Sequence, residues 1–168
     1  MQKRALIVGV SGVIGSALAE RLLKNHWRVY GLSRGNTAIP AGCQSLLADL
    51  TDAASVRAAI GELNVDRVFI AAWSRQTTEK ENIRVNGAMV SNVLNALGDS
   101  LAAGHVALVT GLKHYLGPFE AYATGEVPMT PFREAQGRLP VDNFYYEQED
   151  RLFAAAARAA EPTNTFDH

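Results

Sequence analysis

The chain has 168 residues, of which 48% are hydrophobic and 20% are charged, and its formal net charge is −1. This composition is typical of one folded domain, excludes a disordered or fibrous chain, and lacks the basic run that nucleic-acid binding needs. Because Cys43 is the only cysteine and no apolar stretch is long enough to cross a bilayer, we expect a single cytoplasmic domain over residues 1–168, without an internal disulfide or a membrane segment.

Short apolar runs alternate with segments of helical spacing along the chain. We expect strands at residues 4–10, 27–33, 43–50, 66–73 and 105–111, and helices at residues 11–26, 52–63, 81–102 and 143–161. Continuous apolar strands that alternate with helices indicate a parallel sheet covered on both faces. The sequence therefore predicts an α/β fold with a doubly wound parallel sheet of about five strands.

One long connection interrupts this alternation. Residues 111–142 contain several Pro and Gly residues and no clean periodicity, and the connection is longer than loops without a role usually are. We expect it to be functional or partly disordered. Either Asp142 or Asn143 can cap the helix that follows, as Asp52 can cap the helix at residues 52–63.

The first strand runs into a glycine-rich turn, GVSGVIG, in which Gly9, Gly12 and Gly15 precede or open the first helix. Glycines in this place permit a tight turn and let a pyrophosphate approach the N–H groups of the helix N-terminus. Three glycines also fit a tight turn that binds nothing. The strand, helix and strand that flank them favour a dinucleotide site, as in the NAD(P)-binding Rossmann fold.

The end of the second strand bears on the choice of dinucleotide. An acid there binds the 2′-hydroxyl of NAD, whereas an arginine accommodates the 2′-phosphate of NADP. This sequence has Ser33 and Arg34 and no acid, which favours NADPH, although Arg34 also fits a solvated surface position. Asp49, at the end of the third strand, either meets the adenine edge or caps a loop.

The chain resembles the extended branch of the short-chain dehydrogenase/reductase superfamily, whose signature is the same glycine turn. Most members carry a Tyr-x-x-x-Lys pair on one helix, but no tyrosine of this sequence has a lysine four positions later. A narrower group does match through VFIAAWSRQTTEKENIRVNGAMVSNVLNAL, TGLKHYLGPFEAY and NFYYEQED. These stretches are similar to those of the progesterone 5β-reductase and iridoid synthase-like enone reductases, in which the catalytic lysine follows the fifth strand.

This resemblance implies an NADPH-dependent oxidoreductase that reduces the C=C bond of an enone by hydride transfer to the β-carbon. Lys113 matches the family lysine and Tyr145 the family tyrosine, so these are the expected catalytic residues. The tyrosine hydroxyl would donate to the enolate oxygen, and the ammonium would lower the pKa of that phenol. Tyr146, its neighbour, is expected to serve packing only.

Two further positions match the family. Trp73 resembles a residue beside the cofactor, and Asn86 resembles an asparagine that stabilises the site. We expect no metal site, because the four histidines lack ligand spacing. The expected cofactor-binding residues are Gly9, Ser11, Gly12, Val13, Ile14, Gly15, Ser33, Arg34, Asp49, Leu50, Ala71, Trp73, Asn86 and Thr110.

The resemblance extends from the first strand to about Phe153. Family chains continue into a sixth strand and a C-terminal region that makes most of the substrate pocket, and we expect this region to be missing here. The fifth strand would then be an edge through which copies of the chain can associate. A nucleotide-binding or sensing module with little or no catalysis is therefore the alternative function, whereas the missing Tyr-x-x-x-Lys pair disfavours an epimerase or dehydratase.

Overall fold

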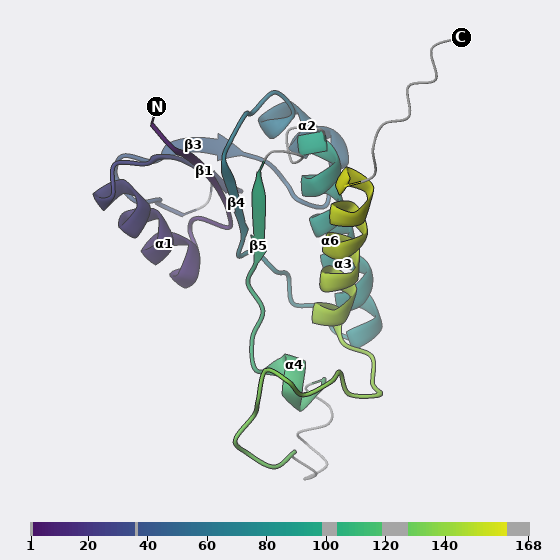
Figure 1. Ribbon diagram of the computed structural model, residues 1–168. Helices are drawn as coiled ribbons and strands as arrows, with labels where there is room; N and C mark the ends of the chain where they lie inside the picture. The colour runs from purple at the N-terminus through teal and green to yellow at the C-terminus, as the bar shows by residue number, and fades with distance from the viewer. Residues whose placement is uncertain (1, 36, 99–103, 119–127, 161–168) are drawn as a thin grey trace.

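The computed structural model describes residues 2–35, 37–98, 104–118 and 128–160, and a five-stranded sheet lies at its centre (Figure 1). The strands are β1 (Arg4–Val8), β2 (Arg28–Ser33), β3 (Gln44–Leu47), β4 (Arg67–Ile70) and β5 (His105–Leu108). Adjacent strands are parallel, and their spatial order is β3-β2-β1-β4-β5. The predicted doubly wound parallel sheet is confirmed.

Helices cover both faces of this sheet. Figure 1 shows α1 (Val13–Lys24) on one side and α2 (Ala53–Ile60), α3 (Glu79–Leu97) and α6 (Phe144–Ala160) on the other. The larger apolar core lies under α2, α3 and α6, and a smaller core lies under α1. Among the described residues, no helix combines the length and the apolar character that a membrane span requires.

Three helix starts are set by short polar side chains. The predicted cap of α2 is confirmed, because the Asp52 carboxylate accepts hydrogen bonds from the N–H groups of Ala54 and Ser55. Thr78 caps α3, which therefore begins at Glu79 instead of residue 81. For α6, Asn143 is the cap of the two candidates, since its Oδ1 accepts a hydrogen bond from the N–H of Tyr145.

The strands are shorter than predicted, and the described part of the long connection contains a short helix. β3 ends at Leu47 and β4 at Ile70, because the apolar residues that follow them leave the sheet to line a cleft. One short helix, α4 (Lys113–Leu116), forms within the predicted loop and ends at Gly117, whose φ is 82°. Residues 119–127 of that connection lie outside the described part of the chain.

α3 and α6 pack closely against each other at Gly87. A Cβ at this glycine would lie 2.7 Å from Nε of Arg151 and 2.9 Å from Cγ of Glu147. Arg151 also donates from Nε to Oε1 of Glu147 at 2.6 Å and from Nη1 to Oγ of Ser91 at 2.7 Å. α3 and α6 therefore lie so close at Gly87 that a side chain at this position would require Arg151 and Glu147 to shift.

β5 lies at one edge of the sheet, and in the described part of the chain it pairs with β4 alone. Its residues from Val106 to Leu108 are only half-buried. Phe153, on α6, is 63% exposed. The edge expected from the sequence is thus present, with apolar groups at its surface.

Candidate functional site

A cleft of about 590 Å³ opens beyond the carboxyl ends of β1, β2, β4 and β5, where the strand order changes direction. Open α/β sheets bind their ligands at this place. The cleft is lined by Gly9, Ser11, Gly12, Val13, Ile14, Leu32, Ser33, Arg34, Ala48, Asp49, Leu50, Thr51, Ala71, Ala72, Trp73, Ser74, Met89, Val109, Thr110, Gly111 and Tyr145. All of the predicted cofactor residues except Gly15 and Asn86 are among them, as is Tyr145, whereas Lys113 is not.

The glycine turn forms one wall of the cleft. Gly9 has a φ of +88°, and a Cβ at Gly15 would lie 2.2 Å from the carbonyl oxygen of Gly9. Gly15 therefore lies behind the wall, where it lets α1 approach the end of β1. Gly12 occupies the cap position of α1 with no side-chain hydrogen bond, and the first turn carries no acidic residue. The N–H groups at this helix end are thus available to an anion.

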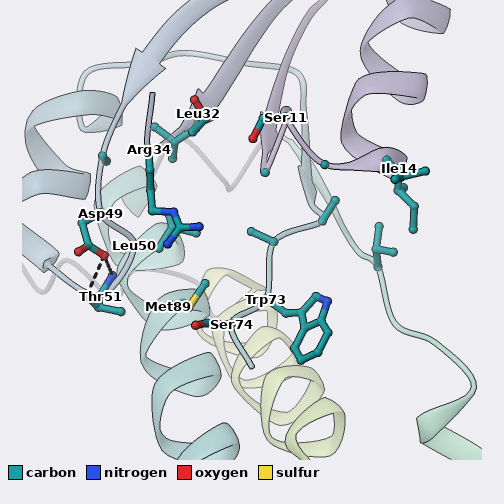
Figure 2. Close-up of a pocket in the computed structure, with 18 of the residues that line it drawn as sticks. Ser11, Ile14, Leu32, Arg34, Asp49, Leu50, Thr51, Trp73, Ser74 and Met89 are labelled. Atoms are coloured by element: carbon teal, nitrogen blue, oxygen red, sulfur yellow. Dashed lines mark hydrogen bonds between the residues drawn. The ribbon is translucent and has the colours of Figure 1, made fainter. Parts of the chain in front are cut away.

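Arg34 and Asp49 lie at one end of the cleft, and Figure 2 shows them on the same side of it, away from Trp73. The Asp49 carboxylate accepts hydrogen bonds from the N–H of Thr51 at 2.9 Å and from its hydroxyl at 2.7 Å. These two bonds, with a smaller contribution from the Arg34 guanidinium, hold the pKa of Asp49 below its usual value. Asp49 therefore caps its loop, which is one of the two roles that the sequence left open.

Trp73 lies at the other end of the cleft (Figure 2). Its ring stacks on that of Phe144, with centroids 5.4 Å apart and an interplanar angle of 15°, and 45% of the residue stays exposed. Leu112, which directly follows the cleft residue Gly111, is 63% exposed. This end of the cleft offers an apolar surface to a small molecule.

Asn86 supports the cleft from behind. It is fully buried, accepts a hydrogen bond from the N–H of Ser74 at 2.7 Å, and donates to the carbonyl oxygens of Ser74 and Asn82. Asn82, one helical turn earlier, accepts a hydrogen bond from the N–H of Gln76. Both asparagines thus fix the loop between β4 and α3, and Ser74 of that loop lines the cleft.

Tyr145 lies in the first turn of α6 and reaches the cleft wall. Its hydroxyl oxygen lies 3.2 Å from the place that a Cβ on Gly111 would take. Any side chain at Gly111 would press on that oxygen, so the glycine leaves room for the hydroxyl. Tyr146, in contrast, is buried, donates from its hydroxyl to the carbonyl oxygen of His114 at 2.5 Å and accepts from the N–H of Leu139 at 3.1 Å.

Lys113 is the first residue of α4 and is only 7% exposed. Its ammonium forms an ion pair with Oε2 of Glu79 at 2.5 Å and lies 4.6 Å from the centre of the Phe144 ring. Its backbone carbonyl oxygen accepts a hydrogen bond from Nδ2 of Asn143 at 2.7 Å. The segment that carries Lys113 is therefore joined to the start of the helix that carries Tyr145.

Glu79 is a site residue that was not predicted from the sequence. One oxygen of this carboxylate accepts hydrogen bonds from Lys113 and from Nδ2 of Asn82, and the other accepts from the N–H of Phe144 at 2.8 Å. The only available signal was an acidic residue directly after the cap Thr78, which is a common arrangement at helix starts. Among the described residues, no group of three or more His, Cys, Asp or Glu side chains is arranged to hold a metal ion.

Comparisons with known proteins place this geometry in a family. The model of the NAD dependent epimerase/dehydratase family matches residues 5–159. An (S)-8-oxocitronellyl enol synthase of Camptotheca acuminata is 38% identical over 171 residues, which cover 95% of this chain and 43% of that protein. The 3-oxo-Δ4,5-steroid 5β-reductase of Arabidopsis thaliana is 40% identical over 163 residues, which cover 89% of this chain and 41% of that protein. The chain thus spans about two-fifths of the length of these relatives, and they confirm the resemblance that its motifs indicated.

A solved structure agrees with the fold. WbmH of Bordetella bronchiseptica, crystallised in complex with NAD⁺, matches with a TM-score of 0.68 and 24% sequence identity, over 92% of this chain and 53% of that one. This likeness shows the common fold alone.

Proposed function

Because the chain belongs to the NAD dependent epimerase/dehydratase family, we propose that it binds NADPH in the cleft and reduces the C=C bond of a small enone. The name of one relative, a steroid 5β-reductase, supports a reductive activity. The lack of a Tyr-x-x-x-Lys pair argues against the epimerases and dehydratases that share this fold.

The residues of the cleft fit a phosphorylated dinucleotide such as NADPH. Gly9 and Gly12 have no Cβ at the turn between β1 and α1, and the first turn of α1 offers N–H groups without a competing carboxylate. At the far end, Arg34 supplies the positive charge that the 2′-phosphate of NADPH requires. When bound, NADPH would supply the hydride.

Tyr145 is the residue that we assign to the developing charge. Negative charge builds on the carbonyl oxygen of an enone as the β-carbon is reduced, and the Tyr145 hydroxyl would donate a hydrogen bond to that oxygen. A donor that is already in place for such an oxygen is commonly worth about 3 kcal/mol of the barrier. Lys113 would add positive charge from the turn after β5, and water would then protonate the α-carbon of the product.

One observation carries the proposal: Tyr145, in the last described helix, lines the same cleft as the glycine turn near the start of the chain. Trp73 gives the same end of the cleft an exposed apolar surface, which suits a hydrocarbon skeleton that carries one carbonyl group.

The test is to mix the protein with NADPH and a simple acyclic enone and to follow the absorbance of the reduced nicotinamide. Tyr145→Phe should lower kcat by about 100-fold or more while the Kd for NADPH changes little, because the donor acts on the substrate oxygen. Tyr146→Phe is the matched control: it should lower stability but keep kcat while the protein is folded. Equal kcat in the wild type and Tyr145→Phe would contradict the assigned role.

A second candidate is a nucleotide-binding or sensing module with little or no turnover. The exposure of Trp73 and Leu112 favours it, because in the described part of the chain nothing covers the apolar end of the cleft. Binding of NADPH without its consumption, across a panel of enones, would support this candidate.

The exposed edge of the sheet provides a route to self-association. Parallel pairing or side-chain packing of a second copy along β5 would cover its half-buried apolar residues. Sedimentation equilibrium of the wild type and of a variant with Ala107→Lys in β5 tests this, since a charge on this strand should shift a dimer toward monomer.

A further inference from the structure

We propose that Glu79 is a positioning residue, which holds Lys113 and the first turn of α6 in one fixed arrangement beside the cleft. The inference rests on the proposed function, because it concerns the two residues assigned to catalysis. Glu79 itself does not line the cleft, so it would act through Lys113 and Tyr145 and not on the substrate.

The carboxylate of Glu79 joins three segments that are distant in sequence. Oε2 accepts hydrogen bonds from Nζ of Lys113, in α4, and from Nδ2 of Asn82, in α3, at 2.5 and 3.0 Å. Oε1 accepts from the N–H of Phe144, the first residue of α6, at 2.8 Å. The residue after Phe144 is Tyr145, so the same side chain holds Lys113 directly and Tyr145 through the backbone of the preceding residue.

Burial makes this arrangement strong. The side chains of Glu79 and Lys113 are only 11% and 7% exposed. Breaking a buried ion pair by removing one charge leaves the other without compensation, which is much more costly than losing a surface pair. Glu79 also places its negative charge at the N-terminal ends of both α3 and α6, where helix dipoles favour it.

Glu81 is the natural comparison on the same helix turn. Its carboxylate pairs with Arg84 at 2.9 Å, and both side chains are largely open to solvent, at 45% and 69% exposure. Surface pairs of this kind contribute little to stability. Glu79→Gln and Glu81→Gln therefore make the same chemical change on the same turn of α3, and only the first acts on the buried arrangement.

The first measurement is the rate at which Lys113 is acetylated by a water-soluble succinimidyl ester, followed by mass spectrometry of its peptide. Without the Glu79 charge the ammonium loses its buried ionic hydrogen bond, so Glu79→Gln should speed the labelling of Lys113 about tenfold. Glu81→Gln should leave the rate unchanged. Equal rates in wild type and Glu79→Gln would overturn the proposal.

The second measurement uses turnover. Glu79→Gln should lower kcat about tenfold and leave the Kd for NADPH within about twofold, since the glycine turn and Arg34 are untouched. A rise in the Kd for NADPH with kcat unchanged would contradict a positioning role. Failure of the wild type to turn over any enone would refute the proposed function instead, and the labelling result would still decide whether Glu79 holds Lys113.

A double variant protects the test against poor folding. If the pair is coupled, Glu79→Gln combined with Lys113→Met should be more stable in urea than Lys113→Met alone, because it leaves no isolated buried charge. Additive losses of stability from the two changes would show that the residues are independent and would overturn the proposal.

Discussion

The side-chain amide of Asn143 donates a hydrogen bond to the backbone carbonyl oxygen of Lys113 over 2.7 Å. The same side chain caps α6, because its Oδ1 accepts from the N–H of Tyr145 over 3.0 Å. One buried amide therefore connects the turn after β5 to the helix that brings Tyr145 to the cleft.

Replacing Asn143 should break both of these bonds. We expect Asn143→Ala to lower the free energy of unfolding by about 2 to 3 kcal/mol, from the lost cap and from a buried carbonyl oxygen without its donor. Urea unfolding followed by tryptophan fluorescence measures it. The neighbouring Asp142 is exposed, so Asp142→Ala should change stability by less than about 0.5 kcal/mol, and equal losses in the two variants would contradict the capping role.

Gly15 should not tolerate even a methyl group. Its Cβ would lie 2.2 Å from the carbonyl oxygen of Gly9, so Gly15→Ala must push α1 away from the turn. We expect a loss of about 3 kcal/mol of stability and weaker NADPH binding, measured by urea unfolding and by fluorescence titration. A Cβ at Gly137 would meet nothing within 4 Å, so Gly137→Ala should stay within about 1 kcal/mol of the wild type.

Asn86 should be needed for the shape of the cleft although it does not line it. Asn86→Ala leaves the N–H and the carbonyl oxygen of Ser74 without their partner, and we expect a loss of about 3 kcal/mol of stability. The affinity of Asn86→Ala for NADPH should also fall, because Ser74 is part of the cleft wall. Asn95, exposed on the same helix, is the control: Asn95→Ala should be neutral or stabilise by about 0.5 kcal/mol. Equal NADPH affinity in Asn86→Ala and the wild type would contradict the link.

Asp49 should make stability depend on pH in the acid range. The pKa of this carboxyl is lowered in the folded protein, so its contribution is present above its unfolded pKa of about 3.9 and is lost as the pH falls through the folded value. As the pH is lowered from 6 to 3, the urea concentration at the midpoint of unfolding should therefore fall less steeply in Asp49→Asn than in the wild type. Thr51→Val removes the hydroxyl donor and should give an intermediate slope, whereas identical slopes in all three proteins would refute the assignment.

The local features of the chain were predictable from its sequence. The parallel sheet followed from apolar runs that alternate with helices, and the cap at Asp52 followed from one short acidic side chain before a helix. The glycine turn was also predictable, because the tight turn after β1 and the close approach of α1 to that strand both depend on neighbouring residues. Each of these features involves residues that are close together in the chain.

The contacts that organise the site were not predictable in this way. Glu79 meets Lys113 across 34 positions and the N–H of Phe144 across 65, and no periodicity reports such contacts. The helix at Lys113–Leu116 was missed because a single turn shows no repeat of apolar residues. Asp49 had two plausible roles, and only the position of Thr51 indicated which of them its hydrogen bonds serve.

The close contact at Gly87 makes the orientation of the proposed catalytic tyrosine sensitive to a residue that never touches it. The side chains of Glu147 and Arg151 pack over the backbone of that glycine, and both residues follow Tyr145 within the first two turns of α6. A methyl group at position 87 would require the side chains of Glu147 and Arg151 to shift, and any shift that moves α6 as a whole would also move the Tyr145 phenol. At position 87 the size of the side chain should therefore matter more than its charge or its polarity.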